Sequence, residues 1–318
     1  MVGKVTPNTK LSASKVPGLL GQSKYETPNQ ILSGCINALQ DIEPTFNANE
    51  SMHWGNLLEV PILLEASGRL GLSNLRLDHP IAYHHPDAPI ACSLDGDGDG
   101  NGLVVYTSPE QGIYVIGQDS ITLDGVGVLE AKLTANYPED VPAMSRGPLQ
   151  LQAQMDIVGA KWGAVCVLYQ GTTLRIFLFA PHEETQALIR SSARDFETKL
   201  MHWSETGEVD WYKPVDAKDA ALVWPGDENL ETVNLGQSGA NFAAAIAKAK
   251  AEIKALETEI SDNEKELREM MGNATSAVAG EYTIKWPVRH YAAQPVKVTP
   301  AKEAYSVRQS TLTIKESK

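Results

Sequence analysis

The sequence predicts an α/β (α+β) fold in which a central mixed β-sheet is flanked by helices and followed by a long C-terminal helix and a basic tail. Strand-like apolar runs alternate with helix-like periodic segments over the first two thirds of the chain. Such alternation favours a sheet covered by helices. We therefore expect a core at 1–205, a linker at 206–240, a heptad-bearing helix at 241–272 and a basic extension at 273–318.

Composition excludes several classes of protein. The chain has 318 residues and 42% hydrophobic content, enough to bury a full core. No run of 18 apolar residues predicts a membrane span, and residues 1–10 lack the apolar centre of a signal peptide. Cys35, Cys92 and Cys166 are too few and too scattered for a disulfide framework, a zinc site or an iron–sulfur cluster. We expect a cytoplasmic protein that does not contact a membrane.

The first long element predicted is a helix that begins near His53 and ends at Gly68, because apolar residues keep helical spacing between them. The next segment, Ala91 to Gly96, is typical of a strand that ends in a glycine turn. From Asp95 the chain continues as Asp-Gly-Asp-Gly-Asp-Gly-Asn-Gly.

Aspartates at alternate positions followed by glycine are how an EF-hand calcium loop begins. The twelfth position of such a loop would be Tyr106, where a glutamate is required, and no helices are predicted on either side. The alternative is a Gly-rich turn in which Asp95 carries the chemistry and Asp97 and Asp99 are solvated. Beyond it, residues 103–106 and 113–117 predict an added β-hairpin.

Glu130 and Lys132 form the central candidate site. Residues 127–133 are typical of a strand, in which side chains two positions apart share a face. Glu130 and Lys132 therefore point the same way, whereas Ala131 points into the core and can lend its carbonyl. Together with Asp95, these oxygen atoms suit Mg²⁺, and the lysine suits the charge that develops on a phosphodiester under attack. Taken alone, the Glu-Ala-Lys tripeptide also fits a solvated ion pair.

The remaining elements follow from local patterns. Residues 149–158 predict a helix capped by Gly159, residues 162–169 and 173–180 predict two strands, and residues 183–203 predict a helix. A long helix is predicted at 241–271, capped by Gly272, because one heptad series holds Ile246, Ile253, Ile260 and Leu267 and another, three positions on, holds Ala249, Leu256, Asn263 and Met270. This helix either folds back on its own domain or reaches another subunit, a partner or DNA.

The net charge of −13 is unevenly distributed. Residues 1–25 carry +4 and residues 281–318 carry +4, so that the segment between them carries −21. This asymmetry suits an enzyme that encloses DNA in a basic channel, and basic ends that are simply solvated are the alternative. Residues 282–291 interleave aromatic and basic side chains, which suits stacking on single-stranded bases, or an edge strand with its aromatics in the core.

Four blocks occur in a defined order along the chain: Trp54-Gly55-x-x-x-Glu59, Ala91-Cys92-Ser93-x-Asp95-Gly96, Glu130-x-Lys132 and Gln150-x-Gln152-x-x-Met155. In this order they resemble the active-site motifs of the phage lambda exonuclease and YqaJ-type viral recombinase family, a branch of the PD-(D/E)XK nuclease superfamily. The resemblance covers residues 10–205 and implies a PD-(D/E)XK nuclease core. The sequence departs from the family in the long gap between Asp95 and Glu130, which the predicted hairpin fills.

The resemblance implies a role for each matched residue. Asp95, Glu130 and the Ala131 carbonyl would bind Mg²⁺, for which Mn²⁺ can substitute. Lys132 would stabilise charge on the scissile phosphate or orient the attacking water. Glu59 would support a second metal or its waters.

Further roles follow from the blocks that flank this centre. Gln152 would fix the lysine and the substrate, and Ser14 and Ser93 would bind the 5′-phosphate of a DNA end. An alternative for Ser12 or Ser14 is a helix N-cap. The arginine that the family places about seven residues before Ser14 is missing, and Lys10 supplies the nearest positive charge.

The function implied by the resemblance is a Mg²⁺-dependent exonuclease that digests linear double-stranded DNA from 5′ to 3′ and leaves single-stranded DNA for phage-type homologous recombination. It implies double-stranded DNA ends as substrate, a trimeric ring, a single-strand annealing protein as partner, and a phage or prophage gene acting in the bacterial host cytoplasm. Two alternatives stay open: a restriction- or repair-type endonuclease of the same superfamily, and a non-catalytic DNA-binding or scaffold protein.

Overall fold

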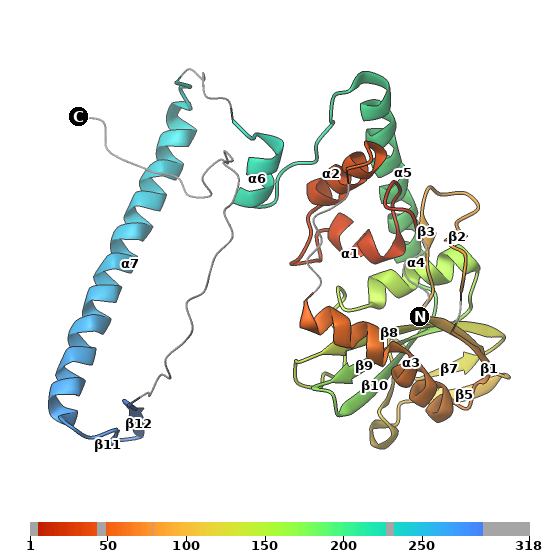
Figure 1. Cartoon of the computed structure of the whole chain (residues 1–318), viewed down its shortest axis with the longest axis horizontal. Coiled ribbons are helices and arrows are strands. Elements are labelled where there is room, and N and C mark those ends of the chain that lie inside the picture. Colours follow the sequence, from red (N-terminus) through yellow and green to blue (C-terminus); the bar gives the residue numbers. More distant parts are fainter. Residues whose placement is uncertain (1–5, 43–48, 78, 227–231, 289–318) are drawn as a thin grey trace, which may run out of the picture. The chain divides into compact units, whose positions relative to one another are not determined.

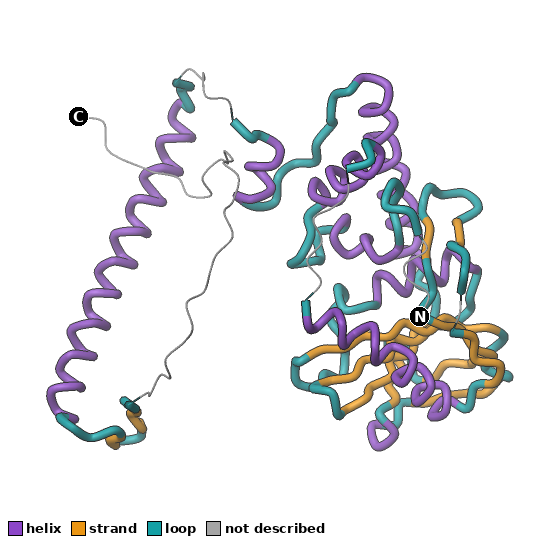
Figure 2. The backbone as a smooth tube through the Cα atoms, viewed as in Figure 1, coloured by secondary structure: helices purple, strands orange, loops and turns teal. Residues whose placement is uncertain are grey.

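The computed structural model describes residues 6–42, 49–77, 79–226 and 232–288. The chain forms two compact units, Met1–Trp224 and Pro225–Lys318. The first unit contains the sheet and most of the helices, and the second contains one long helix (Figures 1 and 2). No helix among the described residues is long and apolar enough to cross a membrane.

The first unit is built on a six-stranded sheet. Its strand order is β1-β4-β8-β9-β10-β6, with bounds β1 Ser73–Arg76, β4 Gly96–Asp99, β8 Val126–Thr134, β9 Gly163–Tyr169, β10 Thr173–Phe179 and β6 Ile113–Val115. The β8–β9 and β10–β6 pairs are parallel and the other three are antiparallel. The predicted mixed sheet, flanked by helices, is therefore confirmed.

Helices cover both faces of the sheet (Figure 1). On one face lie α1 (Val16–Leu19), α2 (Pro28–Leu39), α4 (Pro148–Val158) and α5 (Glu183–Thr206), whose core includes Val128 and Val165. On the other lies α3 (Glu50–Leu70), whose core includes Leu129 and Ala164. Neighbouring residues of β8 and β9 thus contribute to opposite cores, as the alternation of side chains along a strand requires.

The predicted ends of α3 and α4 compare differently with the structure. Helix α4 ends at its predicted cap, Gly159, which has the left-handed conformation favoured by glycine. Helix α3 continues past Gly68 and ends at Gly71, which is also left-handed.

The Asp-Gly run forms strand β4, so both the solvated turn and the EF-hand loop are wrong. Its glycines allow close packing against α3, because a Cβ at Gly96 would lie 3.1 Å from Leu63 Cδ1. Asp97 is buried and forms an ion pair with Arg76 of β1, and Asp99 lies 3.3 Å from the same guanidinium. The neighbouring strand supplies a charge that local sequence cannot reveal.

The predicted hairpin between Asp95 and Glu130 is also wrong. Strand β5 (Leu103–Tyr106) pairs instead with β7 (Ser120–Leu123) in a separate two-stranded sheet, and η2 (Pro109–Gln111) follows β5. Strand β6 joins the main sheet beside β10. All three β6 residues are buried, which explains why this apolar run forms part of the core sheet rather than an exposed hairpin.

The first unit continues past the predicted boundary at residue 205. Helix α6 (Ala217–Val223) lies in the segment predicted as a linker. Its fully buried Asp219 accepts hydrogen bonds from Thr27 Oγ1 at 2.5 Å and Asn29 Nδ2 at 3.0 Å, which tie α6 to the start of α2. A second small sheet pairs β2 (Tyr83–His84) with β3 (Ala91–Cys92).

The second unit consists of α7 (Gly236–Met271) and a hairpin of β11 (Ser276–Ala279) and β12 (Tyr282–Lys285). The predicted long helix is present, with Gly272 as its C-cap. The Arg268 guanidinium lies 5.9 Å from the Trp286 ring, so the hairpin end packs on the end of α7. Tyr282 is 69% exposed, and the alternative in which this segment places its aromatics in a core is therefore wrong for Tyr282. Residues 289–318, most of the basic extension, lie outside the described residues.

A substitution at Gly147 tests how closely the start of α4 packs against the sheet. Gly147 precedes α4 with φ 118°, and a Cβ there would lie 2.6 Å from Val165 Cγ1. We expect Gly147→Ala to lower the free energy of unfolding by about 1–3 kcal/mol, measured by urea denaturation, because it adds backbone strain and overpacking. Gly34→Ala, in open space on α2, is the control and should raise it by about 0.5–1 kcal/mol. Equal effects of the two changes would contradict this account.

Candidate active site

Glu130 is a buried carboxylate near the middle of the sheet, with a side chain that is only 1% exposed. Its Oε1 pairs with the Lys132 ammonium, and its Oε2 accepts a hydrogen bond of 2.7 Å from Gln154 Nε2. A buried charge is tolerated only when it is paired and hydrogen-bonded in this way. Glu130 and Lys132 share a face of β8 as predicted, but the pair is part of the core rather than the solvated pair that the tripeptide alone permits.

Asp95 lies beside β8 immediately before β4. The pairing of β4 with β8 ends at Gly96 and Leu129. Beyond that point the Ala131 N–H donates a hydrogen bond of 2.9 Å to Asp95 Oδ2. In an extended strand the N–H and C=O of one residue point to the same edge, so the Ala131 carbonyl also faces the Asp95 side. The structure thus places Asp95, Glu130, Ala131 and Lys132 at one point of the sheet.

The electrostatics of these groups are strongly coupled. Burial and the neighbouring Glu130 raise the pKa of Asp95 well above its usual range. Burial also raises the pKa of Glu59 on α3, and Glu130 raises it further. Burial alone would lower the pKa of Lys132, but Glu130 and Asp95 more than compensate and raise it. If all three carboxylates and the ammonium were ionised, the cluster would carry a charge of about −2, and this surplus adds to burial in raising the pKa of Asp95 and Glu59.

This donor set fits a hard divalent cation. In the described parts of the chain, no three side chains of His, Cys, Asp or Glu are grouped so that they could hold a metal ion. The candidate ligands are instead the Asp95 and Glu130 carboxylates and the Ala131 carbonyl. Mg²⁺ is usually bound through one or two carboxylates and keeps several waters, so two carboxylates suffice. A charge of +2 also balances the local surplus.

Helix α4 presents two glutamines to this cluster. Gln154 binds Glu130, and Gln150 Oε1 accepts a hydrogen bond of 3.2 Å from Lys132 Nζ. The two residues are four positions apart, so they lie on one face of the helix. Their hydrogen bonds fix the Glu130 carboxylate and orient the Lys132 ammonium from the α4 side of the sheet.

The prediction that Gln152 fixes the lysine is wrong. Gln152 Nε2 donates a hydrogen bond of 2.8 Å to the Ala180 carbonyl, and its Oε1 accepts one of 2.9 Å from the His182 N–H. Two positions along a helix correspond to a rotation of about 200°, which turns Gln152 away from the Gln150 face. The helical period was the signal in the sequence that identifies Gln150 and Gln154.

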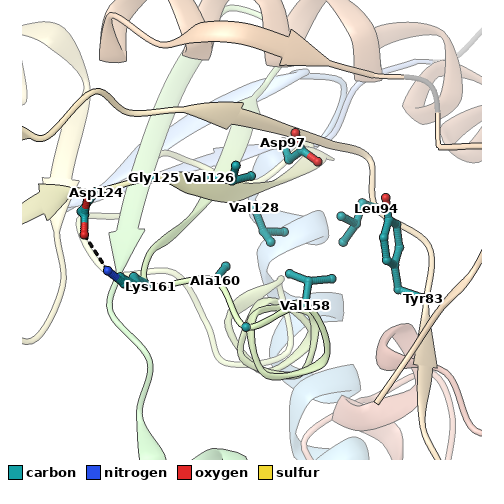
Figure 3. Close-up of a pocket in the computed structure, with 11 residues that line it drawn as sticks. Tyr83, Leu94, Asp97, Asp124, Gly125, Val126, Val128, Val158, Ala160 and Lys161 are labelled. Carbon is teal, nitrogen blue, oxygen red and sulfur yellow. Dashed lines mark hydrogen bonds and ion pairs between the residues drawn. The ribbon is translucent and has the colours of Figure 1, made fainter. Parts of the chain in front are cut away.

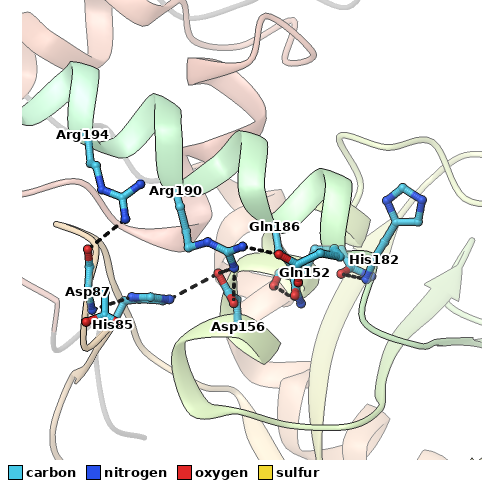
Figure 4. Close-up of polar contacts among 9 residues, drawn as sticks. His85, Asp87, Gln152, Asp156, His182, Gln186, Arg190 and Arg194 are labelled. Atoms are coloured by element: carbon cyan, nitrogen blue, oxygen red, sulfur yellow. Dashed lines mark hydrogen bonds and ion pairs between the residues drawn. The ribbon is translucent and has the colours of Figure 1, made fainter.

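A polar network fixes the far side of α4 (Figure 4). Arg190 of α5 donates hydrogen bonds of 2.7 and 2.9 Å to the Asp156 carboxylate on α4. His85 Nε2 lies 3.4 Å from the same carboxylate, and His85 Nδ1 accepts a hydrogen bond from the Asp87 N–H. Because α4 is held from this side, the glutamines on its other face keep their positions over the cluster.

The residues assigned to a 5′-phosphate pocket lie near the β3 strand. Ser12 forms an isolated bridge with Ala91, and its hydroxyl lies 3.1 Å from that of Ser14, which is exposed. Ser12 occupies the N-cap position of the short helix η1 (Ala13–Lys15) without a side-chain cap hydrogen bond. Ser93 Oγ accepts a hydrogen bond of 3.2 Å from the Thr6 N–H, and Lys10 is exposed. The phosphate role of these residues stays a prediction.

A separate pocket of about 360 Å³ opens between β8 and the end of α4 (Figure 3). Its walls are mainly apolar, and Lys161 and Asp124 form an ion pair of 2.7 Å at its rim. It is lined by Tyr83, Leu94, Asp97, Asp124, Gly125, Val126, Val128, Val158, Gly159, Ala160 and Lys161. Glu130 and Lys132 do not line this pocket and lie further along β8.

Comparisons with known proteins give similarity at the level of structure. No protein-family model matches the chain. No curated protein sequence matches it. Similar solved structures include the alkaline exonuclease LHK-Exo from Laribacter hongkongensis in complex with dAMP, with a TM-score of 0.45 and 17% identity over 63% of this chain and 91% of that one.

A second crystal structure of LHK-Exo gives a TM-score of 0.44 with the same identity and coverage. A phage-related exonuclease from Haemophilus somnus gives a TM-score of 0.37 and 11% identity, over 61% of this chain and 96% of that one.

The opposite pKa shifts of Asp95 and Asp99 predict opposite effects on stability. The raised pKa of Asp95 means that its ionised form destabilises the folded chain. We expect Asp95→Asn to raise the free energy of unfolding at pH 7 by about 0.5–2 kcal/mol. This gain should shrink as the pH falls from the raised pKa of Asp95 in the folded chain towards the usual pKa of Asp near 4, because below that pH the carboxyl is protonated in the folded and the unfolded chain alike.

The matched control is Asp99→Asn at the end of β4, the strand that follows Asp95. Hydrogen bonds from Asn74 and Arg76 lower the pKa of Asp99, so its ionised form stabilises the fold. The substitution should therefore lower stability at pH 7, and the difference should disappear as the pH falls below the lowered pKa. Urea denaturation at a series of pH values from about 3 to about 8, which spans the usual pKa of Asp, measures the free energy of unfolding of both variants. A change of the same sign in both variants would contradict the assignment.

Proposed function

We propose that this protein is a Mg²⁺-dependent nuclease. The observation that carries the proposal is the convergence of Asp95, Glu130 and Lys132, with Glu59, around a surplus of negative charge in the sheet. A scaffold protein has no need to bury carboxylates that oppose one another, because such groups cost stability. Perturbed carboxylates beside a lysine are typical of sites that bind a metal and act on phosphate esters.

Each side chain has a distinct part in this proposal. Asp95 and Glu130 bind the metal, and the Ala131 carbonyl completes the set of protein oxygens. The chemistry that a bound Mg²⁺ supplies in such sites is neutralisation of phosphate charge and acidification of a water. Glu59, half-buried and held at a raised pKa, would orient the attacking water or accept a proton from it.

Lys132 serves the phosphate. Its side chain is 30% exposed, whereas that of its partner Glu130 is 1% exposed, so Lys132 is the more accessible member of the pair. The contacts to Glu130 and Gln150 orient it, and the raised pKa keeps it charged at neutral pH. A fixed ammonium at this position stabilises the charge that develops on a scissile phosphate.

For the substrate, we propose linear double-stranded DNA digested from 5′ to 3′, with single-stranded DNA as the product used in phage-type recombination. Ser14, Ser93 and Lys10 are proposed to hold the 5′-phosphate, since hydroxyl groups and an ammonium all donate to phosphate oxygens. A homo-oligomeric ring around the DNA and a single-strand annealing protein as partner complete the proposal. The sequence resemblance supports these finer assignments.

Activity of single variants tests the catalytic assignment. Purified protein should degrade end-labelled linear duplex DNA in Mg²⁺ and not in EDTA. We expect Asp95→Asn and Lys132→Ala each to lower the rate by about 100-fold or more, because each removes a group that meets charge in the transition state. Asp99→Asn, which removes the same charge from the far end of β4, should keep the wild-type rate. Full activity of the Asp95 or Lys132 variant would overturn the assignment.

Substrate topology separates an exonuclease from the endonuclease alternative. We expect linear duplex to be consumed from its ends while covalently closed circular duplex of the same sequence stays intact. Label at the 5′ end should be released before label at the 3′ end if digestion runs from 5′ to 3′. Linearisation or nicking of the circle at a comparable rate would favour an endonuclease with the same metal site.

A further inference from the structure

Helix α7 carries an apolar seam that the other described residues of its unit, 225–226, 232–235 and 272–288, leave open. The seam follows the heptad positions a and d along a helix of about 54 Å. Ile253, Leu256 and Ile260 in its centre are 55%, 58% and 59% exposed. Among the described residues of 232–288, the hairpin contacts only the C-terminal end, where Met271 is buried.

An exposed apolar seam on a long helix is usually buried against another segment of protein, which we call its cover. Most helical stability in proteins comes from packing an apolar face, and a lone helix in water gains little from its own hydrogen bonds. Candidates for the cover are a second copy of α7, the chain's own first unit, or a different protein. The charges beside the seam distinguish among them.

Positions e and g, which flank a coiled-coil seam, are mostly acidic in α7. Six charged residues lie there, and all but Lys250 are glutamates: Glu252, Glu257, Glu259, Glu264 and Glu266. In a parallel pair of identical helices, Glu252 of one copy would face Glu257 of the other, and Glu259 would face Glu264. In an antiparallel pair, the g positions face each other, and the three charged residues there, Glu252, Glu259 and Glu266, are again all glutamates. Self-pairing of α7 therefore sets like charges against each other.

The first unit is also a poor cover on grounds of charge. Residues 1–224 contain 27 acidic and 15 basic residues, a net charge of −12. Glu257, Glu259 and Glu266 have no ion pair within the described part of α7, whereas Arg268 binds Glu264 at 2.6 Å and Lys248 lies 3.9 Å from Glu252. Within the described residues, these three glutamates therefore lack a positively charged partner.

We propose that α7 is a docking helix for a basic amphipathic helix of another protein. The partner helix carries an apolar seam flanked by lysine or arginine, which pairs with Glu257, Glu259 and Glu266. Asn263 interrupts the seam at a d position and selects a partner with a polar residue opposite, which fixes the register. This inference does not depend on the proposed nuclease function.

Two synthetic peptides of about four heptads test the proposal against the full-length protein. Both have the same isoleucine and leucine seam with one asparagine, and they differ only in lysine or glutamate at every e and g position. We expect the lysine-flanked peptide to bind at least 10-fold more tightly in fluorescence anisotropy, a difference of about 1.4 kcal/mol in binding free energy. Its affinity should fall as the salt concentration increases.

Two variants of the full-length protein provide the controls. Ile253→Asp breaks the seam and keeps the acidic flanks, so it should abolish binding of the lysine-flanked peptide. The triple variant Glu257→Lys, Glu259→Lys and Glu266→Lys should reverse the preference between the two peptides. Circular dichroism confirms that α7 stays helical in each.

Four results would overturn the proposal. Equal binding of the two peptides would remove the charge rule, and unchanged binding by Ile253→Asp would reduce the effect to a generally acidic surface. Binding of neither peptide would mean that the chain itself covers the seam. A homo-oligomer that Ile253→Asp dissociates, seen by sedimentation, would identify a second copy as the true occupant.

Discussion

The buried Glu130 carboxylate is the constraint on which the arrangement of this site depends. A charge that is 1% exposed must be matched by donors, and here they come from Lys132 two positions along the same strand and from Gln154 on α4. The strand contact is available locally, whereas the second donor requires α4 to lie in one orientation above the sheet. The ion pair between Arg190 and Asp156 secures that orientation from the other side. The position of α4 and the geometry of the cluster are therefore one problem with one solution.

The cluster contains more negatively charged groups than positively charged ones. Burial and the neighbouring Glu130 raise the pKa of both Asp95 and Glu59, and Lys132 balances only part of the negative charge. Natural proteins keep such unfavourable groups at functional sites, where they are offset by the rest of the fold. A divalent cation removes the conflict and gains affinity from it. The same feature that costs stability in the free protein thus provides the driving force for the metal binding that we propose.

The sequence predicts well what is set by neighbours along the chain. Strand β8, helix α4 with its Gly159 cap and the heptads of α7 follow from local periodicity, and the juxtaposition of Glu130 with Lys132 follows from the strand repeat. It fails where distant segments decide. Strand β6 leaves its expected hairpin for the edge beside β10, Asp97 is neutralised by Arg76 from another strand, and α6 attaches to α2 through Asp219. Gln152 was a different error, because the helical period already favoured its neighbours.

The central claim is that Asp95 and Glu130 form a site with a deficit of positive charge that Mg²⁺ fills. The most direct measurement is the thermal midpoint of unfolding at neutral pH with and without Mg²⁺, for the wild type and for Glu130→Gln. A ligand that binds only the folded state raises the midpoint by roughly 2–4 °C for each kcal/mol of binding. The account predicts a rise for the wild type that is absent from Glu130→Gln. An unchanged wild-type midpoint, or an equal rise in both proteins, would contradict it.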